Sequence, residues 1–190
     1  MAEKKLPADL GECVAFHGHL CPGLVIGYRA AKLGMRQLNA QRAGDEELIA
    51  IVENDTCAVD AVQVLTGCTF GKGNLFFRDY GKMAFTFATR ANGRSVRLSL
   101  HPVGPVDAGD VPEGERRRRR IGFMLASDPS EMFDVRADAL ATLPEAARNR
   151  DSAPCDGCGE MVMSTRIRRR GDRNLCVSCD ENGPKVERPQ

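Results

Sequence analysis

The sequence contains no tryptophan, and its aromatic share is only 5%. A surface that stacks nucleic-acid bases needs exposed rings, and so few rings argue against one. No apolar run approaches the roughly 18 residues that a membrane-spanning helix needs. The formal net charge is +1, so the chain as a whole has no electrostatic attraction to nucleic acid or to an anionic membrane. Neither nucleic acid nor a membrane is therefore expected as a partner.

A secretory signal is also missing, because the N-terminal stretch MAEKKLPADLGE has no apolar middle region. We therefore expect a cytoplasmic protein, in a compartment where thiols stay reduced. The chain nevertheless contains 8 cysteines. In that compartment they indicate metal binding or chemical reactivity rather than a framework of disulfides.

The 190 residues suffice for one domain of ordinary size and a small appendage. A helix is predicted from Pro22, because apolar residues recur every three or four positions from Leu24 to Leu38. Further predictions are a strand at 47–54, a helix at 55–67, a hairpin at 83–100 with a two-residue type I′ turn at 92–93, and helices from 116 and 128. Residues 144–154 resemble a linker, so the predicted domains are 1–150 and 151–190.

The C-terminal segment carries the most specific motif. Two Cys-x2-Cys pairs are separated by 17 residues, a spacing typical of a zinc ribbon or treble clef. Each pair directs two thiolates at one point, and two pairs complete a tetrahedron. A segment of 40 residues buries too little apolar area to fold alone, so we expect zinc to stabilise it. The predicted ligands of this structural zinc are Cys155, Cys158, Cys176 and Cys179.

Two basic runs leave the partners of the protein open. Arginines at 166 and 168–170 lie between the cysteine pairs, yet residues 151–190 hold seven basic and seven acidic residues. The run Arg116 to Arg120 follows Glu113 and Glu115. A docking or dimerising module and a solvated helix face are favoured. Contact with nucleic acid or an acidic partner is the alternative for both runs.

A second group of metal-ligand residues lies in the first domain. The stretch FHGHLCPG places His17, His19 and Cys21 immediately before the predicted helix, and Cys57 opens the next predicted helix. A helix N-terminus favours a negative charge and so lowers the pKa of a thiol. These four residues are predicted to converge on one divalent metal, with Cys21 and Cys57 as candidates for reactive thiolates. Zinc suits the donors best, ahead of iron or nickel, and fewer than four protein ligands leave an open coordination position.

The alternative is that each residue has an ordinary role. A histidine beside glycine is often a surface or capping residue, and a buried cysteine packs as a small hydrophobe. Two imidazoles stand together just before the start of a predicted helix, and this favours a metal site. Cys13 is expected to be a bystander, and Cys68 lies between the two cases.

The glycine-rich loop at 67–74 has two open interpretations. It can form an anion cradle, in which backbone N–H groups with Lys72 and Asn74 bind a phosphate or carboxylate cofactor. It can equally be a tight turn that leads into a strand. The nearby carboxyl groups of Asp55 and Asp60 are candidates for an acid or base, although capping and surface positions explain them equally well.

Three stretches together resemble the E-subunit family of formylmethanofuran dehydrogenase. They are FHGHLCPGLVIGYRAA, ENDTCAVDAVQVLTGCTFGKGN and CDGCGEMVMSTRIRRRGDRNLCVSC, and they occur in the order that the family has. The resemblance implies an α+β core domain with a mixed or antiparallel sheet, a C-terminal treble-clef zinc finger and an intertwined homodimer. It also implies a metal-associated pocket around the segments that bear Cys21 and Cys57. The arginine run at 116–120 matches no role in this family.

The leading hypothesis is a protein with an open His/Cys metal site and a structural zinc finger, linked to one-carbon or redox metabolism. Whether it catalyses a reaction on a small molecule is left open. One alternative is a non-enzymatic accessory or metal-delivery protein within a larger oxidoreductase complex. The other is a zinc-finger regulator that contacts nucleic acid.

Overall fold

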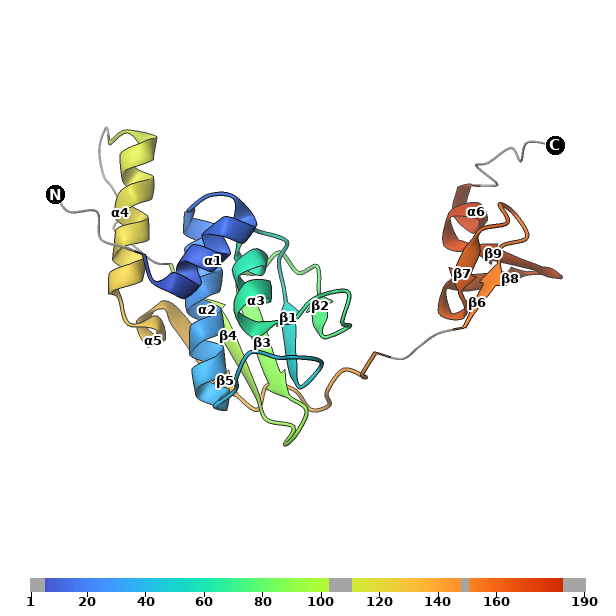
Figure 1. Cartoon of the computed structure of the whole chain (residues 1–190), viewed down its shortest axis with the longest axis horizontal. Helices are drawn as coiled ribbons and strands as arrows, with labels where there is room; N and C mark the ends of the chain where they lie inside the picture. Colours follow the sequence, from blue (N-terminus) through green and yellow to red (C-terminus); the bar gives the residue numbers. More distant parts are fainter. Residues whose placement is uncertain (1–5, 103–110, 148–150, 183–190) are drawn as a thin grey trace. The chain divides into compact units, whose positions relative to one another are not determined.

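The computed structural model describes residues 6–102, 111–147 and 151–182 (Figure 1). The chain divides into two compact units, Met1–Ala147 and Arg148–Gln190, which we call the core unit and the C-terminal unit. The predicted domain boundary at Arg150 lies outside the described residues. No helix in the described ranges is long and apolar enough to cross a membrane.

The core unit is built on a five-stranded sheet in the order β2-β1-β3-β4-β5. Strands β1 and β2 are parallel, and every other neighbouring pair is antiparallel. A mixed sheet packed against helices confirms the predicted α+β class. The strands are β1 (Leu48–Val52), β2 (Leu75–Phe77), β3 (Ala84–Thr89), β4 (Ser95–Leu100) and β5 (Phe133–Ala137).

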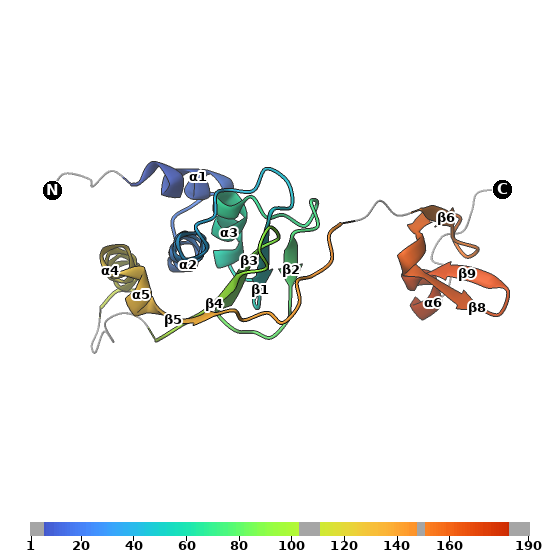
Figure 2. The same cartoon turned by 90° about the horizontal axis from the view of Figure 1, so that it is seen from below.

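Helices lie on one face of this sheet, as Figure 2 shows: the second and third helices pack on the strands, and the first helix packs on these two helices. Inward-facing residues of β1, β3 and β4 share one hydrophobic core with them. A short fifth helix links the fourth helix to β5. The helices are α1 (Ala8–His17), α2 (Pro22–Leu38), α3 (Ala58–Thr66), α4 (Glu113–Ala126) and α5 (Pro129–Met132).

Helix α2 begins and ends as its sequence predicts. Pro22 occupies the first turn, and the apolar stripe from Leu24 to Leu38 is buried except for the half-buried Met35. Gly27 allows α3 to approach closely, since a Cβ atom there would lie 2.0 Å from the carbonyl oxygen of Ala58. This close crossing brings the N-termini of α2 and α3 together.

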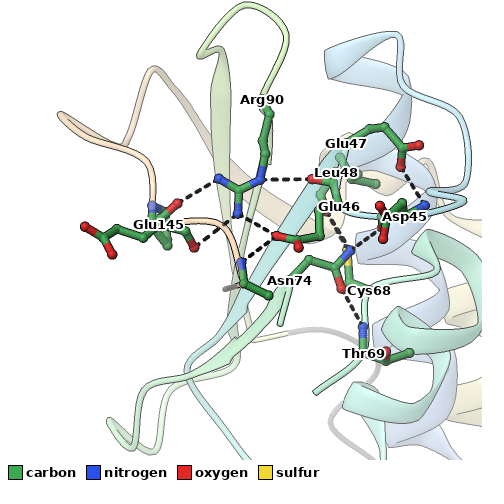
Figure 3. A network of polar contacts seen from close by, with 11 residues as sticks. Asp45, Glu46, Glu47, Leu48, Cys68, Thr69, Asn74, Arg90 and Glu145 are labelled. Carbon is green, nitrogen blue, oxygen red and sulfur yellow. Dashed lines mark hydrogen bonds and ion pairs between the residues drawn. The ribbon is translucent and has the colours of Figure 1, made fainter. Parts of the chain in front are cut away.

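The opposite face of the sheet is covered by the segment that follows β5. Leu140 and Leu143 pack on Ile49, Ile51 and Ala88. The guanidinium group of Arg90 holds the end of this segment by donating to the carbonyl oxygens of residues 46, 144 and 145 (Figure 3). The final residues of the core unit are therefore tied to the sheet.

Sequence patterns missed or misjudged three local elements. Helix α1 has only two buried residues, so its apolar periodicity is weak. The helix start predicted at residue 128 is present, but the helix has only four residues, and strand β5 follows it without having been predicted. The type I′ turn is wrong: of its two central residues only Gly93 has a positive φ. A four-residue loop at 90–93 forms instead, because the Asn92 side chain accepts from the N–H of Arg94 and the Thr89 hydroxyl.

The C-terminal unit consists of two small hairpins and a short helix (Figure 1). The first hairpin pairs β6 with β7, and the second pairs β8 with β9. Its apolar cluster is small and consists of Leu175 and Val162 together with the four cysteines. The elements are β6 (Ser152–Pro154), β7 (Met161–Met163), the 3-10 helix η1 (Ser164–Arg166), β8 (Ile167–Arg170), β9 (Arg173–Cys176) and α6 (Val177–Asn182).

Candidate metal centres

Three predicted ligands of the core unit meet at one point. His17 is the last residue of α1, Cys21 is the N-cap of α2, and Cys57 is the N-cap of α3. One ligand atom from each side chain lies within 4.8 Å of the other two. No fourth histidine, cysteine, aspartate or glutamate of the described residues joins this group. We call these three residues the core cluster.

Local backbone geometry explains how His17 and Cys21 meet. Gly18 ends α1 in the left-handed conformation, with a φ of 94°, and so reverses the chain between the two residues. The thiol of Cys21 then caps α2 by accepting a hydrogen bond from the N–H of Leu24 at 3.3 Å. Cys21 is only 5% exposed, so its sulfur is held in a defined position.

Asp60 orients the imidazole ring of His17. The distance between His17 Nδ1 and Asp60 Oδ2 is 2.7 Å. Because a carboxylate accepts, Nδ1 donates, which leaves the lone pair of Nε2 facing the Cys21 sulfur at 3.7 Å. A carboxylate that fixes the ring of a ligating histidine is a common feature of zinc sites. Sequence reasoning left the role of Asp60 open; its signal was the Cys57-x2-Asp60 spacing on the first turn of α3.

The donor set and its spacing fit a tetrahedral zinc ion. Zinc–sulfur and zinc–nitrogen bonds of about 2.3 and 2.0–2.1 Å at a tetrahedral angle place the two ligand atoms about 3.6 Å apart. The observed separation of Cys21 Sγ and His17 Nε2 is 3.7 Å. Two thiolates and one imidazole also match the ligands that zinc prefers. The residues present therefore fit the metal, and they leave one coordination position to a further ligand.

The pKa of the Cys57 thiol is raised above its ordinary value, first by the partial burial of this otherwise exposed residue and then by the neighbouring thiol of Cys21. The helix N-terminus had predicted the opposite direction. At this position burial and the Cys21 thiol outweigh the backbone hydrogen bond that acts to lower the pKa.

The other thiols and the second imidazole of the core unit lie outside the cluster. Burial raises the pKa of Cys13 to about 11 and that of Cys68 to about 11. The Cys68 thiol donates to the carbonyl oxygen of Leu48. His19 is not among the three grouped ligands; its ring lies against that of His17, with 4.7 Å between centroids. Cys13 and Cys68 thus pack in the core, and His19 contacts a ligand rather than joining it.

Lys72 and Asn74 make hydrogen bonds to the backbone. Figure 3 shows those of Asn74. The ammonium group of Lys72 donates to the carbonyl oxygens of Ala43 and Gly44. The fully buried amide of Asn74 donates to Leu48 and to Asp45, and accepts from the N–H of residue 69. These bonds fasten the glycine-rich loop to the turn before β1. The geometry favours the tight-turn interpretation over the anion cradle.

The four cysteines of the C-terminal unit form a second cluster, with ligand atoms within 4.8 Å of one another. The sulfur of Cys155 accepts from the backbone N–H groups of Gly157 and Cys176, at 3.3 and 3.1 Å. These bonds, the Cys176 N–H first, lower the pKa of Cys155 to about 6. Gly157 allows Cys179 to approach closely, since a Cβ atom there would lie 2.9 Å from Cys179 Sγ. This four-cysteine cluster has the donors and closed arrangement of a structural zinc site.

Acidic side chains pair with both basic runs. Asp180 forms ion pairs with Arg168 and Arg170, and the hydrogen bond from Arg170 is the main reason that the pKa of Asp180 falls to about 2. On α4, Arg116 pairs with Glu113 and an ion pair joins residues 115 and 119. These pairs reduce the positive potential that a nucleic-acid surface needs.

A mixed sheet covered by helices, with a His/Cys cluster at the helix N-termini and a four-cysteine unit after it, defines a class of α+β metal-binding proteins. The chain belongs to the FmdE family, described as FmdE, molybdenum formylmethanofuran dehydrogenase operon, whose model matches residues 16–146. The core cluster lies inside this range, and the four-cysteine cluster lies beyond it. The predicted family is confirmed.

Two relatives extend the comparison. The crystal structure of a tungsten formylmethanofuran dehydrogenase FmdE-like protein from Syntrophus aciditrophicus has a TM-score of 0.68 and 28% sequence identity, and the match covers 93% of this chain and 92% of that one. A probable S-adenosyl-L-methionine-binding protein of Archaeoglobus fulgidus is 28% identical over an alignment of 201 positions, and the match covers 93% of this chain. The chain spans about half the length of that relative, 54%.

Proposed function

We propose that the core unit binds a divalent metal, zinc in preference to iron or nickel, through His17, Cys21 and Cys57. The observation that carries this proposal is the Asp60–His17 hydrogen bond, which aims Nε2 of His17 at the Cys21 sulfur. A bound zinc ion supplies a Lewis acid with one open position. The protein orients the imidazole through Asp60 and holds Cys21 through the backbone of α2. Chemistry at this centre would serve one-carbon or redox metabolism, in keeping with the name of the family.

The C-terminal unit is proposed to be a treble clef with a structural zinc ion. Its first cysteine pair lies between β6 and β7, and its second lies at the end of β9 and in α6. The small apolar cluster around Leu175 cannot stabilise the unit alone, whereas zinc binding contributes on the order of 10 kcal/mol. The unit would then serve as a docking or dimerising module of a cytoplasmic homodimer.

Metal analysis of the purified protein tests both sites. We expect two metal equivalents per chain in the wild type. The double variant His17→Ala/Cys57→Ala should lose one equivalent and keep its helical circular dichroism. Cys68→Ser is the matched control, because its thiol is buried outside both clusters, and it should keep both equivalents. An unchanged metal content in the double variant refutes the core site.

A non-enzymatic role in metal delivery is the second candidate, and the exposure of Cys57 favours it. An ion held by three residues, one of them at the surface, is accessible to an incoming ligand. In this role the core metal would pass to a chelator or an acceptor apoprotein within minutes, while the four-cysteine site keeps its zinc. A stopped-flow measurement with a colorimetric chelator separates the two sites by rate. Equal release rates contradict a delivery role, and co-purification with an oxidoreductase would identify the acceptor.

A further inference from the structure

A cavity of about 280 Å³ lies beside the core cluster, where the parallel strands β1 and β2 end. Its wall includes Val52 and Phe77, the last residues of the two strands, and the first two turns of α3. Strands β1 and β2 with the intervening α3 form a βαβ unit. Ligands of such units bind in the crevice outside the carboxyl ends of the strands. The cavity therefore lies where this topology places a binding site.

Some polar side chains that line the cavity form hydrogen bonds within the protein, and others do not. Thr56 donates to the side-chain oxygen of Asn54, and Asn54 donates to the carbonyl oxygen of residue 82. In contrast, the side chains of Asp55 and Gln63 form no hydrogen bond or ion pair with any described residue. Asp60 uses one carboxylate oxygen for His17. Two carboxylates and one amide thus remain available to a ligand.

The charge of the cavity favours a cation. Asp55 and Asp60 both line it, and no lysine, arginine or histidine among the described residues does so. The N-terminus of α3 opposes them with a partial positive charge of roughly one half. Two formal negative charges exceed that value, so an anion is repelled and a cation is attracted.

The rest of the wall is apolar and aromatic. Val52 and Val59 line the interior, while Phe70 and Phe77 leave 64% and 42% of their surface exposed. Exposed rings beside carboxylates are suited to a cation that carries a flat apolar group, because the ring face attracts the charge and the ring body covers the apolar part.

The cavity and the core cluster share α3. Cys57 follows Thr56 of the cavity wall directly, and Asp60 both lines the cavity and bonds His17. A ligand that contacts the Asp60 carboxylate is therefore one residue away from the imidazole of the proposed metal centre.

We infer that this cavity binds a small organic cation with an aromatic or other flat apolar group, and that Asp60 places it beside the metal centre. The second half of this inference rests on the proposed function, whereas the binding half does not. Asp55 and the two exposed phenylalanine rings supply most of the recognition, and Gln63 adds a hydrogen bond.

Three probes test the binding half by titration calorimetry and backbone amide shifts. Benzyltrimethylammonium has both charge and ring, tetramethylammonium lacks the ring, and phenylacetate has the opposite charge. We expect saturable 1:1 binding of benzyltrimethylammonium, with shifts at residues 54–63, 70 and 77, and at least tenfold weaker binding of the other two. Equal binding of phenylacetate, or no saturable binding of benzyltrimethylammonium, overturns the inference.

Matched variants locate the site. Asp55→Asn and Phe70→Ala should each weaken benzyltrimethylammonium binding about tenfold, because each removes one recognition element without touching the core cluster. Glu131→Gln, an exposed carboxyl group on α5 outside the cavity, should have no effect. Unchanged affinity in Asp55→Asn places the probe elsewhere and refutes the site.

Cobalt substitution tests the placement half. Titrating benzyltrimethylammonium into the Co²⁺-loaded protein should change the visible d–d bands with the same Kd as the amide shifts; constant bands overturn the placement beside the metal. The double variant His17→Ala/Cys57→Ala should still bind the probe within about threefold of the wild-type affinity. If the core unit takes up no metal but the probe still binds, the proposed function fails and the binding half stands.

Discussion

The two ligand clusters of this protein are constructed in different ways. The core cluster draws three ligands from α1, α2 and α3, which already pack into a large hydrophobic core. The four-cysteine cluster is itself the centre of the C-terminal unit, with little apolar material around it. In the core unit the fold positions the ligands, whereas in the C-terminal unit the proposed zinc ion would join the ligands and so hold the fold together. Function is thus expected at the first cluster and stability at the second.

Removing one ligand from each cluster gives the largest contrast. Cys176→Ser should unfold the whole C-terminal unit, because it removes most of a metal-binding contribution of about 10 kcal/mol. His17→Ala should remove the core metal and leave the core unit folded. Amide hydrogen exchange of residues 151–182 and of the β1–β3–β4 strands reports the two units separately. Ser178→Ala, at an exposed position between two cysteines, is the control and should change neither. A C-terminal unit that stays protected in Cys176→Ser would remove the distinction.

The same contrast explains what the sequence could predict. The four cysteines stand in two close pairs with spacing typical of zinc units, so the cluster could be predicted from the sequence alone. The core cluster depends on a contact between residues 43 positions apart, His17 and Asp60, which only the packing of α1 on α3 creates. Local residue types still indicated its ligands, since Cys21 and Cys57 stand at helix N-termini.

Other features escaped prediction for the same reason. His19 resembles His17 in the sequence, and only the chain reversal at Gly18 decides which ring faces Cys21. Lys72 and Asn74 lie in a loop suited to an anion, yet long-range backbone acceptors engage both. The parallel pairing of β1 with β2, and with it the cavity, has no local signal. Helix α2, β1, α3 and the strands of the hairpin have strong periodicity, and all of them were predicted.

Substituting one glycine in each unit compares how rigidly the two units hold their ligands, and the expected changes in stability are smaller than those above. Gly27→Ala should cost about 3 kcal/mol, since its Cβ meets the α3 backbone at Ala58 and the rigid helix must move. Because Cys57 precedes Ala58, core metal affinity should fall as well. Gly157→Ala should cost about 1 kcal/mol, because the nearest obstacle is the side-chain sulfur of Cys179.

Chemical denaturation with metal analysis measures both glycine variants. Gly11→Ala is the control: nothing lies within 4 Å of its added Cβ atom in α1, and it should stabilise the core by about 0.5–1 kcal/mol. A smaller loss in Gly27→Ala than in Gly157→Ala would show that the fold does not hold the core ligands rigidly.

Asp60→Asn tests whether the core cluster depends on a group that orients one of its ligands. The four-cysteine cluster is expected to have no such dependence. Loss of the carboxylate should weaken core metal affinity about 10–100-fold, the effect expected when the partner of a ligating histidine is removed. Zinc affinity of the C-terminal unit should not change. Competition with a chelator of known affinity measures both values in one protein. Asp55→Asn, in the loop before α3 and without a hydrogen bond to His17, is the matched control. Equal weakening in both variants would assign the effect to charge alone.

The smallest expected difference between the two units is in the response of their stability to acid. It is measured in the double variant His17→Ala/Cys57→Ala, which lacks the core metal. Arg97 donates two hydrogen bonds to the buried carboxylate of Glu53, at 2.7 and 2.9 Å, and this holds the pKa of Glu53 below its ordinary value of 4.5. A lowered folded-state pKa contributes stability above about pH 4.5, and the contribution is lost as the pH falls through the folded pKa. In Glu53→Gln, the melting temperature of the core unit should therefore fall less steeply as the pH is lowered from 6 to 3.5.

The effect of Glu53→Gln should be modest because Arg97 remains 26% exposed and water screens the pair. Melting followed through backbone amides of β1 separates the core unit from the C-terminal unit, whose thiolates take up protons and release metal in the same range. Glu131→Gln is the control for removing a carboxyl group without an ion pair among the described residues, and its acid limb should match the parent. An unchanged slope in Glu53→Gln would mean that the acid response of the core arises elsewhere. The two units would then still differ in how their metal ligands are positioned, but this ion pair would not distinguish the pH dependence of their stability.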